Sequence, residues 1–362
     1  MLLIICNIQL RAQDTLKLNY KEAEALLIKE NLNILASHYD VKIAEAQTIQ
    51  AKAWVNPYLH WNQDMYSVEK NEYFAYKRQA LIQVDQTFSI AGKHTNTVRL
   101  AKVGLEINKL MLQDVTRSLI YELGIQFNDL SALQLKQEIY DDVLKKYEER
   151  ISAGEKSLQI GSMAGNEVLR LKSELIALKT TYLESTTQLY NVMSNIREML
   201  NLKPEVYIKA ITSSEVRDTV INIADLYNGS MMYRPDYNLS LKNVLYAETN
   251  LKLQNSIAVP DINVGYQPLD RGSNYVRTYS GLVVEFSLPF FNRNTGNIMM
   301  AKSQLNKSDV LKRQKENQLL NEVNTAYMQW SSVKKCLDNY TDTFLNSIEE
   351  LNQNANYNYN RK

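Results

Sequence analysis

Proline is absent from most of the length of this sequence, and that absence decides which folds are open to the chain. The 362-residue sequence holds 6 prolines, and none lies between Pro57 and Pro204 or after Pro289. Glycine is also scarce, with 11 residues. Proline removes a backbone donor and clashes with the preceding helical turn, so these stretches are free to form uninterrupted helices. The sequence therefore permits helices much longer than those of an ordinary globular domain.

The stretch between Pro57 and Pro204 carries apolar residues in the period of a coiled coil. They recur at steps of three and four, or of their sum, in two sets: Val98, Ala101, Leu105, Leu112, Val115 and Leu119, then Val168, Leu171, Leu175, Leu178, Tyr182, Leu189, Val192, Ile196 and Met199. This spacing predicts a helical hairpin of two antiparallel coiled-coil arms over about 94–200. An arm from 95 to 160 would reach about 100 Å at 1.5 Å per residue, a length that suits a protein bridging the periplasm.

The segment between the two arms has the residues of a tight reversal. Gly161 and Gly165 permit the turn, Asn166 is expected to cap the next helix, and Glu167 suits the positive end of that helix. The predicted tip consists of Gly161, Ser162, Met163, Ala164, Gly165, Asn166, Glu167, Val168 and Leu169.

Landmarks of the first half of the chain recur in the second half. An offset of 203 residues places Pro57 on Pro260 and Ala44-Glu45 on Ala247-Glu248, and offsets of 198 to 200 align the pairs Phe88 and Phe286, Ala101 and Ala301, Leu119 and Leu319, and Glu122 and Glu322. Because the order of the landmarks is kept, we interpret the chain as a tandem duplication of ~200 residues. The predicted segments are 14–204, with a helix, a β-hairpin at about 57–91 and the helical hairpin at about 94–200, and 205–362, with a helix, a β-hairpin at about 260–289 and a helix at about 297–362.

Each β-hairpin shows the two-residue period of a strand with one apolar and one polar face. Tyr58 to Met65 is the weaker partner strand of the first copy, and Ile262, Val264 and Tyr266 mark the first strand of the second. Strands of ~9 to 11 residues have the length that a tilted strand needs to cross a bilayer, although a hairpin lying on soluble helices would alternate in the same way. The positions expected to face lipid are Ile82, Val84, Phe88, Ile90, Leu282, Val284, Phe286 and Leu288.

The first residues have the character of a secretory signal. An apolar run from Leu2 to Leu10 precedes Ala12, so residues 1–13 are predicted to be a signal peptide remnant, although the run lacks a basic start and an ordinary buried segment would read similarly. No later run of about 18 apolar residues occurs, so the sequence predicts no membrane-spanning helix, and any span would have to be built from strands.

Charge and reactive residues exclude several classes of function. There are 41 basic and 40 acidic residues without blocks of like charge, so no nucleic-acid partner is expected. The sequence has no nucleophile elbow, P-loop or dinucleotide fingerprint, so we expect no enzyme and no cofactor. The sequence also predicts no metal site, because Cys6 and Cys336 lie far apart and His38, His60 and His94 lack the spacing of metal ligands. Helix packing explains the pairs Met231-Met232 and Met299-Met300 better than copper binding does.

Taken together, these segments resemble the TolC family of outer-membrane efflux proteins over nearly the whole chain. The resemblance rests on the order, spacing and duplication of Ala44-Glu45, Asn56 to Leu59, Phe88 to Lys93, Ile160 to Leu169, Val259 to Ile262 and Phe286 to Gly296. It implies a mainly α fold with a small β part, in which each protomer adds four membrane-spanning strands to an α/β barrel closed by a homotrimer. Residues 66–78 and 268–278 would be external loops.

The resemblance also implies a function and partners. It implies a passive outer-membrane channel of a tripartite RND-type efflux or type I secretion system in a Gram-negative bacterium, with helices extending into the periplasm. Gly161 to Leu169 would contact a periplasmic adaptor protein, which joins the channel to an inner-membrane pump, and the short loops are most similar to the heavy-metal efflux branch. One departure is that the second copy ends near Lys362, so we expect its last tip and return helix to be missing. The alternative is a periplasmic or surface coiled-coil scaffold without channel activity.

Overall fold

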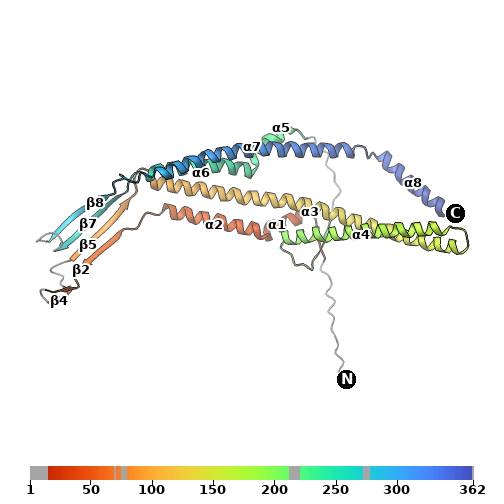
Figure 1. Cartoon of the computed structure of the whole chain (residues 1–362), viewed down its shortest axis with the longest axis horizontal. Coiled ribbons are helices and arrows are strands. Elements are labelled where there is room, and N and C mark those ends of the chain that lie inside the picture. The colour runs from red at the N-terminus through yellow and green to blue at the C-terminus, as the bar shows by residue number, and fades with distance from the viewer. Residues whose placement is uncertain (1–14, 69–70, 75–79, 212–220, 272–277, 361–362) are drawn as a thin grey trace, which may run out of the picture. The chain divides into compact units, whose positions relative to one another are not determined.

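The computed structural model describes residues 15–68, 71–74, 80–211, 221–271 and 278–360, and the side chains of these residues except 352 and 355–360. The predicted leader of residues 1–13 lies outside this range. The helices are α1 (Tyr20–Glu30), α2 (Leu32–Lys52), α3 (Lys93–Gln159), α4 (Gly165–Met199), α5 (Ile223–Tyr233), α6 (Pro235–Ile257), α7 (Thr295–Leu337) and α8 (Asp342–Asn360). The strands are β1 (Thr15–Leu18), β2 (Tyr58–Gln63), β3 (Tyr66–Ser67), β4 (Glu72–Tyr73), β5 (Ala80–Phe88), β6 (Tyr207–Ala210), β7 (Ile262–Arg271) and β8 (Tyr279–Phe286) (Figure 1). The fold is mainly α with a small β part, as predicted.

The chain forms two compact units that differ from the two predicted segments. Unit 1 comprises residues 1–41 and 112–218, and unit 2 comprises residues 42–111 and 219–362. Each unit combines elements from both halves of the sequence, because strands that are distant in the chain pair with each other. In unit 1 strand β1 pairs with β6, and in unit 2 the two β-hairpins join in one sheet.

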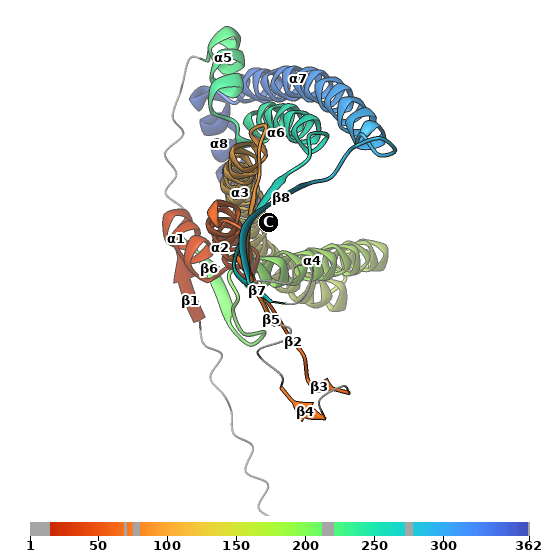
Figure 2. The same ribbon diagram turned by 90° about the vertical axis from the view of Figure 1, so that its left-hand side faces the viewer.

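Unit 1 is built around a core between α1, a two-stranded parallel sheet and turns of α3 and α4. Strands β1 and β6 lie side by side, with Leu16 opposite Ile208 (Figure 2). The core contains several side chains that are less than 2% exposed: Leu27, Leu123, Leu130, Met193, Ile196, Leu200 and Ile208. Leu189, Ile196 and Met199 of the predicted coiled-coil stripe are among the buried residues of this core, so the stripe marks the face of α4 that packs inward here.

Asn31 divides the helix that the sequence predicts before the first β-hairpin. Its backbone is extended, with φ −68° and ψ 125°, so α1 ends before it. Its side-chain oxygen accepts hydrogen bonds from the backbone amides of Asn33 and Ile34, while its amide nitrogen donates to the carbonyl of Met199 at 2.8 Å. Asn31 therefore caps α2 and ties it to the end of α4.

Unit 2 contains a four-stranded antiparallel sheet in the order β2-β5-β7-β8, with helices following its strands. Figure 1 shows these four strands side by side. Helix α6 packs along α7, and α5 packs against both. The hydroxyl of Thr48 in α2 donates to the carbonyl of Ala101 in α3 at 3.4 Å, which brings these two helices together as they approach the sheet.

Arg234 divides the helix that the sequence predicts before the second β-hairpin, at the position equivalent to Asn31. Its backbone is extended, with φ −71° and ψ 122°, and Pro235 begins α6. Proline disfavours a helical conformation in the residue before it and suits the first helical position, so the break follows from the sequence. Helices α1 and α5 thus begin and end at positions separated by the offset of 203 residues that aligns Pro57 with Pro260.

The prediction of one continuous helix over about 297–362 is wrong, because α7 ends at Leu337 and α8 begins at Asp342. Asp338, Asn339 and Thr341 lie in the break. Their short polar side chains compete with helical hydrogen bonds and favour caps, and the Thr341 hydroxyl accepts from the amide of Phe344 at 3.3 Å.

Candidate functional site

The four-stranded sheet has one apolar face, which its register defines. Residues directly opposite each other in an antiparallel sheet share a face, so Leu59, Val84, Tyr266 and Leu282 form one row across all four strands. The large apolar side chains of this face are those of Leu59, Trp61, Ile82, Val84, Phe88, Ile262, Val264, Tyr266, Leu269, Leu282, Val284 and Phe286. Gln86 lies among them, and a row of Gln63, Ala80 and Arg271 continues the face beyond Trp61, Ile82 and Leu269. The apolar part of the face is suited to an apolar environment.

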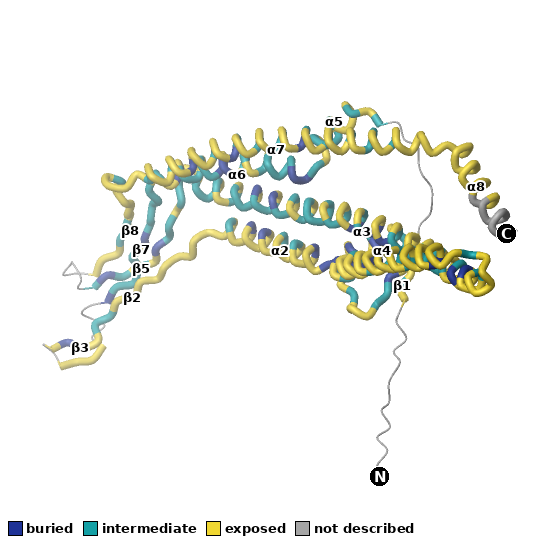
Figure 3. The backbone as a smooth tube through the Cα atoms, turned by 45° about the vertical axis from the view of Figure 1, so that its right-hand side comes forward, coloured by how far each residue is buried: buried dark blue, intermediate teal, exposed yellow. Residues whose placement is uncertain are grey.

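Much of this apolar face is open in the single chain. Trp61 is 74% exposed, Leu282 is 68% exposed and Phe286 is 58% exposed. The central strands β5 and β7 are more buried than β2 and β8, which form the edges of the sheet (Figure 3). Contiguous apolar surface of this kind marks an interaction with another protein or with lipid.

Six of the eight positions that the sequence assigns to lipid contact lie on this face: Ile82, Val84, Phe88, Leu282, Val284 and Phe286. Ile90 and Leu288 lie beyond the strands, which end at Phe88 and Phe286, so their assignment as strand positions is wrong. The carbonyl of Ile90 accepts from the amide of Lys93 in the turn before α3, and Ala91 and Gly92 both have positive φ there. Pro289 follows Leu288 and has no amide to continue the ladder.

The assigned set leaves out Leu59, Trp61, Ile262, Val264 and Tyr266, which belong to the same face. The alternation of apolar and polar residues in β2 and β7 could have identified these five positions from the sequence. Pro268 interrupts that alternation in β7, where a bulge shifts the pairing with both neighbouring strands between Tyr266 and Asp270. Proline cannot donate to the ladder, so a bulge is the position at which a sheet accepts it. Beyond the bulge Leu269, opposite Ile82, returns to the apolar face.

The opposite face of the sheet is polar and centres on Asp85. This residue is 2% exposed; its Oδ1 accepts from Gln83 Nε2 at 2.6 Å, and its Oδ2 lies 3.1 Å from His60 Nε2. Gln267 Nε2 in turn donates to Gln83 Oε1 at 2.6 Å. Gly265 lies directly opposite Asp85, and a Cβ there would stand 2.2 Å from Asp85 Oδ1. The close approach of the carboxylate therefore requires glycine at this position.

The hairpin between α3 and α4 reverses at residues 160–164, which overlap the predicted tip. Gly161 has φ +73°, a conformation that side chains strain. The expected cap at Asn166 is wrong: α4 begins at Gly165, so Asn166 lies inside its first turn, and Ala164 occupies the cap without a side-chain bond. Glu167 lies in the first turn as expected.

Apolar residues at this tip divide between the interior of the hairpin and its surface. Val168 is 4% exposed and packs inward toward Gly154, whereas Leu169 is 64% exposed and Ile160 is 80% exposed. Leu169 and Ile160, the residue before the predicted tip, are therefore the large apolar side chains most exposed at this reversal.

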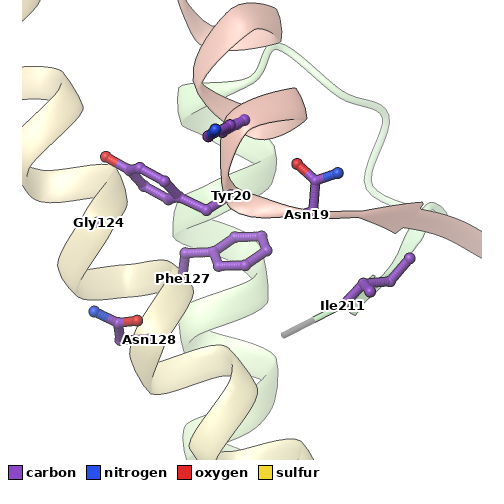
Figure 4. A pocket seen from close by; sticks show the side chains of 7 residues that line it. Asn19, Tyr20, Gly124, Phe127, Asn128 and Ile211 are labelled. Atoms are coloured by element: carbon purple, nitrogen blue, oxygen red, sulfur yellow. The ribbon is translucent and has the colours of Figure 1, made fainter. Parts of the chain in front are cut away.

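A hollow in unit 1 is lined by residues that form no catalytic or metal-binding arrangement. It measures about 770 Å³ and is lined by Asn19, Tyr20, Lys21, Gly124, Phe127, Asn128 and Ile211 (Figure 4). Burial and the Glu24 carboxylate raise the pKa of Tyr20, whose hydroxyl donates to the carbonyl of Ile120. Gly124 leaves room for that ring, so Tyr20 acts in packing.

The remaining candidate ligands stay apart. His38 is exposed, His60 pairs with Asp85, and His94 stacks on Trp54. Met232, Met299 and Met300 are each at least 64% exposed, whereas Met231 is partly buried, so packing within one chain accounts for Met231 alone. Among the described residues no group of three or more His, Cys, Asp or Glu side chains could hold a metal ion. None of the helices within residues 15–360 that the structure describes has the length and apolar content needed to cross a membrane.

Solved structures of outer-membrane channels share this fold. No family model and no curated protein matches the sequence. The outer membrane protein VceC from Vibrio cholerae is similar at 12% identity and a TM-score of 0.72, with 94% of this chain and 85% of that chain covered. CusC is similar at 16% identity and 0.72, with 94% and 82% covered. The MtrE outer membrane channel of Neisseria gonorrhoeae is similar at 13% identity and 0.67, with 88% and 75% covered. The chain therefore has the TolC-like fold of these outer-membrane channels.

Proposed function

We propose that this chain is the outer-membrane channel of a tripartite export system, a passive duct that spans the outer membrane and extends into the periplasm. The apolar face of the four-stranded sheet is the observation that carries the proposal. Six of its members are more than half exposed in the single chain: Leu59, Trp61, Tyr266, Leu282, Val284 and Phe286. The opposite face holds a buried carboxylate and a chain of amide side chains. Such a sheet separates lipid from water.

The open edges of the sheet support assembly of several copies. Strands β2 and β8 each have a neighbour on one side only, and unpaired backbone groups cannot face lipid, so further strands must complete the sheet. Helix α4 also has an exposed apolar stripe. Its residues recur every seven positions and are 55% to 67% exposed: Leu169, Ile176, Leu183 and Tyr190. This period suits packing against another helix. We infer that three copies of the chain close the barrel and cover such exposed apolar stripes.

The hairpin tip supports an adaptor partner. Ile160 and Leu169 offer exposed apolar side chains beside a reversal held by Gly161. In the proposed system a periplasmic adaptor docks at this tip and links the duct to an inner-membrane pump, which supplies the energy and selects the cargo. Photo-crosslinking from position 169 in cells expressing the adaptor tests this contact, with the exposed position 187 on the same helix as a reference.

Two adjacent valines of β8 provide a matched test of the membrane assignment. Val284 lies on the apolar face and pairs with Val264, whereas Val283 lies on the polar face and pairs with Gly265. An arginine on the lipid face costs about 2 to 4 kcal/mol near the bilayer midplane, and an arginine on the polar face costs little. We expect Val284→Arg to reduce the amount of heat-modifiable trimer in outer-membrane fractions, and Val283→Arg to leave it near the wild-type level. Equal amounts for both variants would count against the duct and favour a coiled-coil scaffold.

A further inference from the structure

A basic groove in unit 2 lies where the helices meet the sheet. The groove measures about 370 Å³ and is lined by Lys52, His94, Thr95, Val98, Arg99 and Lys102. Lys52 ends α2 and stands seven residues before Leu59, the first apolar-face position of β2. The other lining residues occupy the first turns of α3, which begins soon after β5 ends at Phe88. The groove therefore adjoins the end of the apolar face.

The cations of the groove are not neutralised by the protein. Lys52, Arg99 and Lys102 make no ion pair or side-chain hydrogen bond with any residue that the structure describes, and none of the lining residues is acidic. The neighbouring Lys93 differs, since its Nζ lies 2.7 Å from Asp261 Oδ1. Three uncompensated positive charges around one hollow concentrate anions there.

An aromatic pair borders the groove. Trp54 stacks on His94 with ring centroids 4.3 Å apart and planes 17° apart, and Trp54 is 61% exposed. Exposed tryptophan beside basic residues is typical of the level at which lipid headgroups meet the apolar interior of a membrane. The stack also fixes the ring of His94, which lines the groove.

The chemistry of the groove favours a phosphate group. Arginine presents a planar fork that matches phosphate oxygens, lysine adds a mobile point charge, and the N-terminal turn of α3 contributes its partial positive charge. We propose that this groove binds the phosphate of an anionic lipid headgroup. That the phosphate belongs to a lipid rests on the proposed membrane location. Recognition of phosphate itself does not rest on it, because a free phosphate ion would meet the same side chains.

The experiment compares three purified forms of the full chain: wild type, Lys52→Gln/Arg99→Gln/Lys102→Gln, and the control Lys109→Gln/Lys252→Gln/Lys302→Gln. The control removes the same charge from three exposed lysines of unit 2 outside the groove. All three forms are made in a Trp61→Phe/Trp330→Phe background, so that Trp54 is the only tryptophan and wild type denotes the unchanged groove and control lysines and arginine. Trp54 fluorescence is titrated with phosphatidylcholine vesicles, with the same vesicles containing phosphatidylglycerol, and with inorganic phosphate. Vesicle flotation measures membrane insertion separately.

We expect wild type and control to respond more strongly to phosphatidylglycerol than to phosphatidylcholine. Binding should weaken about fivefold for each cation removed, hence roughly a hundredfold in the groove variant, and should weaken with added salt. Lys52→Arg/Arg99→Lys/Lys102→Arg should restore most of the response, which a purely structural role of these side chains would not produce. Saturation by inorganic phosphate alone, with no preference for phosphatidylglycerol, would support the phosphate site but assign it to a soluble ligand.

Two failures are distinguishable. If the wild type inserts into vesicles but shows neither a phosphatidylglycerol preference nor a phosphate response, or if groove and control variants respond alike, the groove proposal is overturned while the proposed duct stands. If the wild type does not insert into any vesicle, the proposed duct fails, and the inorganic phosphate titration alone decides whether the groove binds phosphate.

Discussion

Replacing Asp236 by Asn removes the charge that holds the break between α5 and α6 against α7. Asp236 is 8% exposed, and its carboxylate accepts four donors: Arg234 Nε at 3.0 Å, Arg234 Nη2 at 2.6 Å, Lys315 Nζ at 2.8 Å and the backbone amide of Tyr237 at 2.9 Å. Asparagine keeps one acceptor oxygen, and its NH₂ group would point at a cation. The variant therefore leaves at least one charged donor without its partner.

The size of the loss in folding stability depends on how far water can solvate the donors of Arg234 and Lys315 once the carboxylate is gone. Breaking a fully buried ion pair costs about 3 to 5 kcal/mol. Arg234 and Lys315 remain 20% and 25% exposed, and Arg234 keeps Glu322 at 2.7 Å, so part of that loss is recovered. We expect Asp236→Asn to lower the free energy of unfolding by about 2 to 3 kcal/mol. Urea unfolding followed by helical circular dichroism measures this change.

The same network predicts a pH dependence. Burial alone would raise the pKa of the Asp236 carboxyl, but hydrogen bonds from Arg234 and Lys315 outweigh burial and hold this pKa far below its ordinary value of 3.8. A carboxyl with a depressed folded-state pKa contributes stability above its unfolded-state pKa and loses that contribution as the pH falls toward the folded-state pKa. The difference between wild type and Asp236→Asn should therefore be complete at neutral pH and shrink below about pH 4.

Asp309 provides the matched control on α7, because it pairs with Lys312 and Arg313 at the surface. Asp309→Asn should change the stability far less than Asp236→Asn, since exposed pairs contribute little. If the two variants lose equal stability at neutral pH, or if the Asp236→Asn difference persists unchanged in acid, the network does not stabilise the fold in the way described.

Two glycines give further predictions. Gly161→Ala should destabilise the α3–α4 hairpin by about 1 to 2 kcal/mol, because φ of Gly161 is +73°. Gly165→Ala should be neutral or stabilising, because Gly165 lies at the start of α4 and a Cβ there would make only an ordinary contact with Leu158. Thermal unfolding measures both changes, and equal losses of stability would contradict the assigned reversal. Gly265→Ala should displace the Asp85 carboxylate and cost about 2 kcal/mol through lost charged hydrogen bonds. Asp85→Ala removes that clash, so the double variant should lose less stability than the two single losses added together, and strict additivity would refute the contact.

The sequence predicted the elements more reliably than their ends. Alternation in β5 and β8 identified the apolar face because burial on one side of a strand is recorded every second residue. The turns at Ile90 and Leu288 were missed, although Gly92 and Pro289 mark them. The break at Arg234 also had a local signal in Pro235, and the break after Leu337 had one in the run of Asp, Asn and Thr residues.

Length, periodicity and turn residues by themselves determined that this chain forms long helices, two β-hairpins and a reversal at Gly161, because each is a local pattern of side chains. Only the tertiary structure decided that both hairpins share one sheet, that Gly265 lies opposite Asp85, and that Asn31 caps α2 while donating to Met199. It also brought Lys52 to Arg99 and Lys102 around one groove. These pairings join residues far apart in the chain, so register and packing of the whole unit select them, and no local period records them.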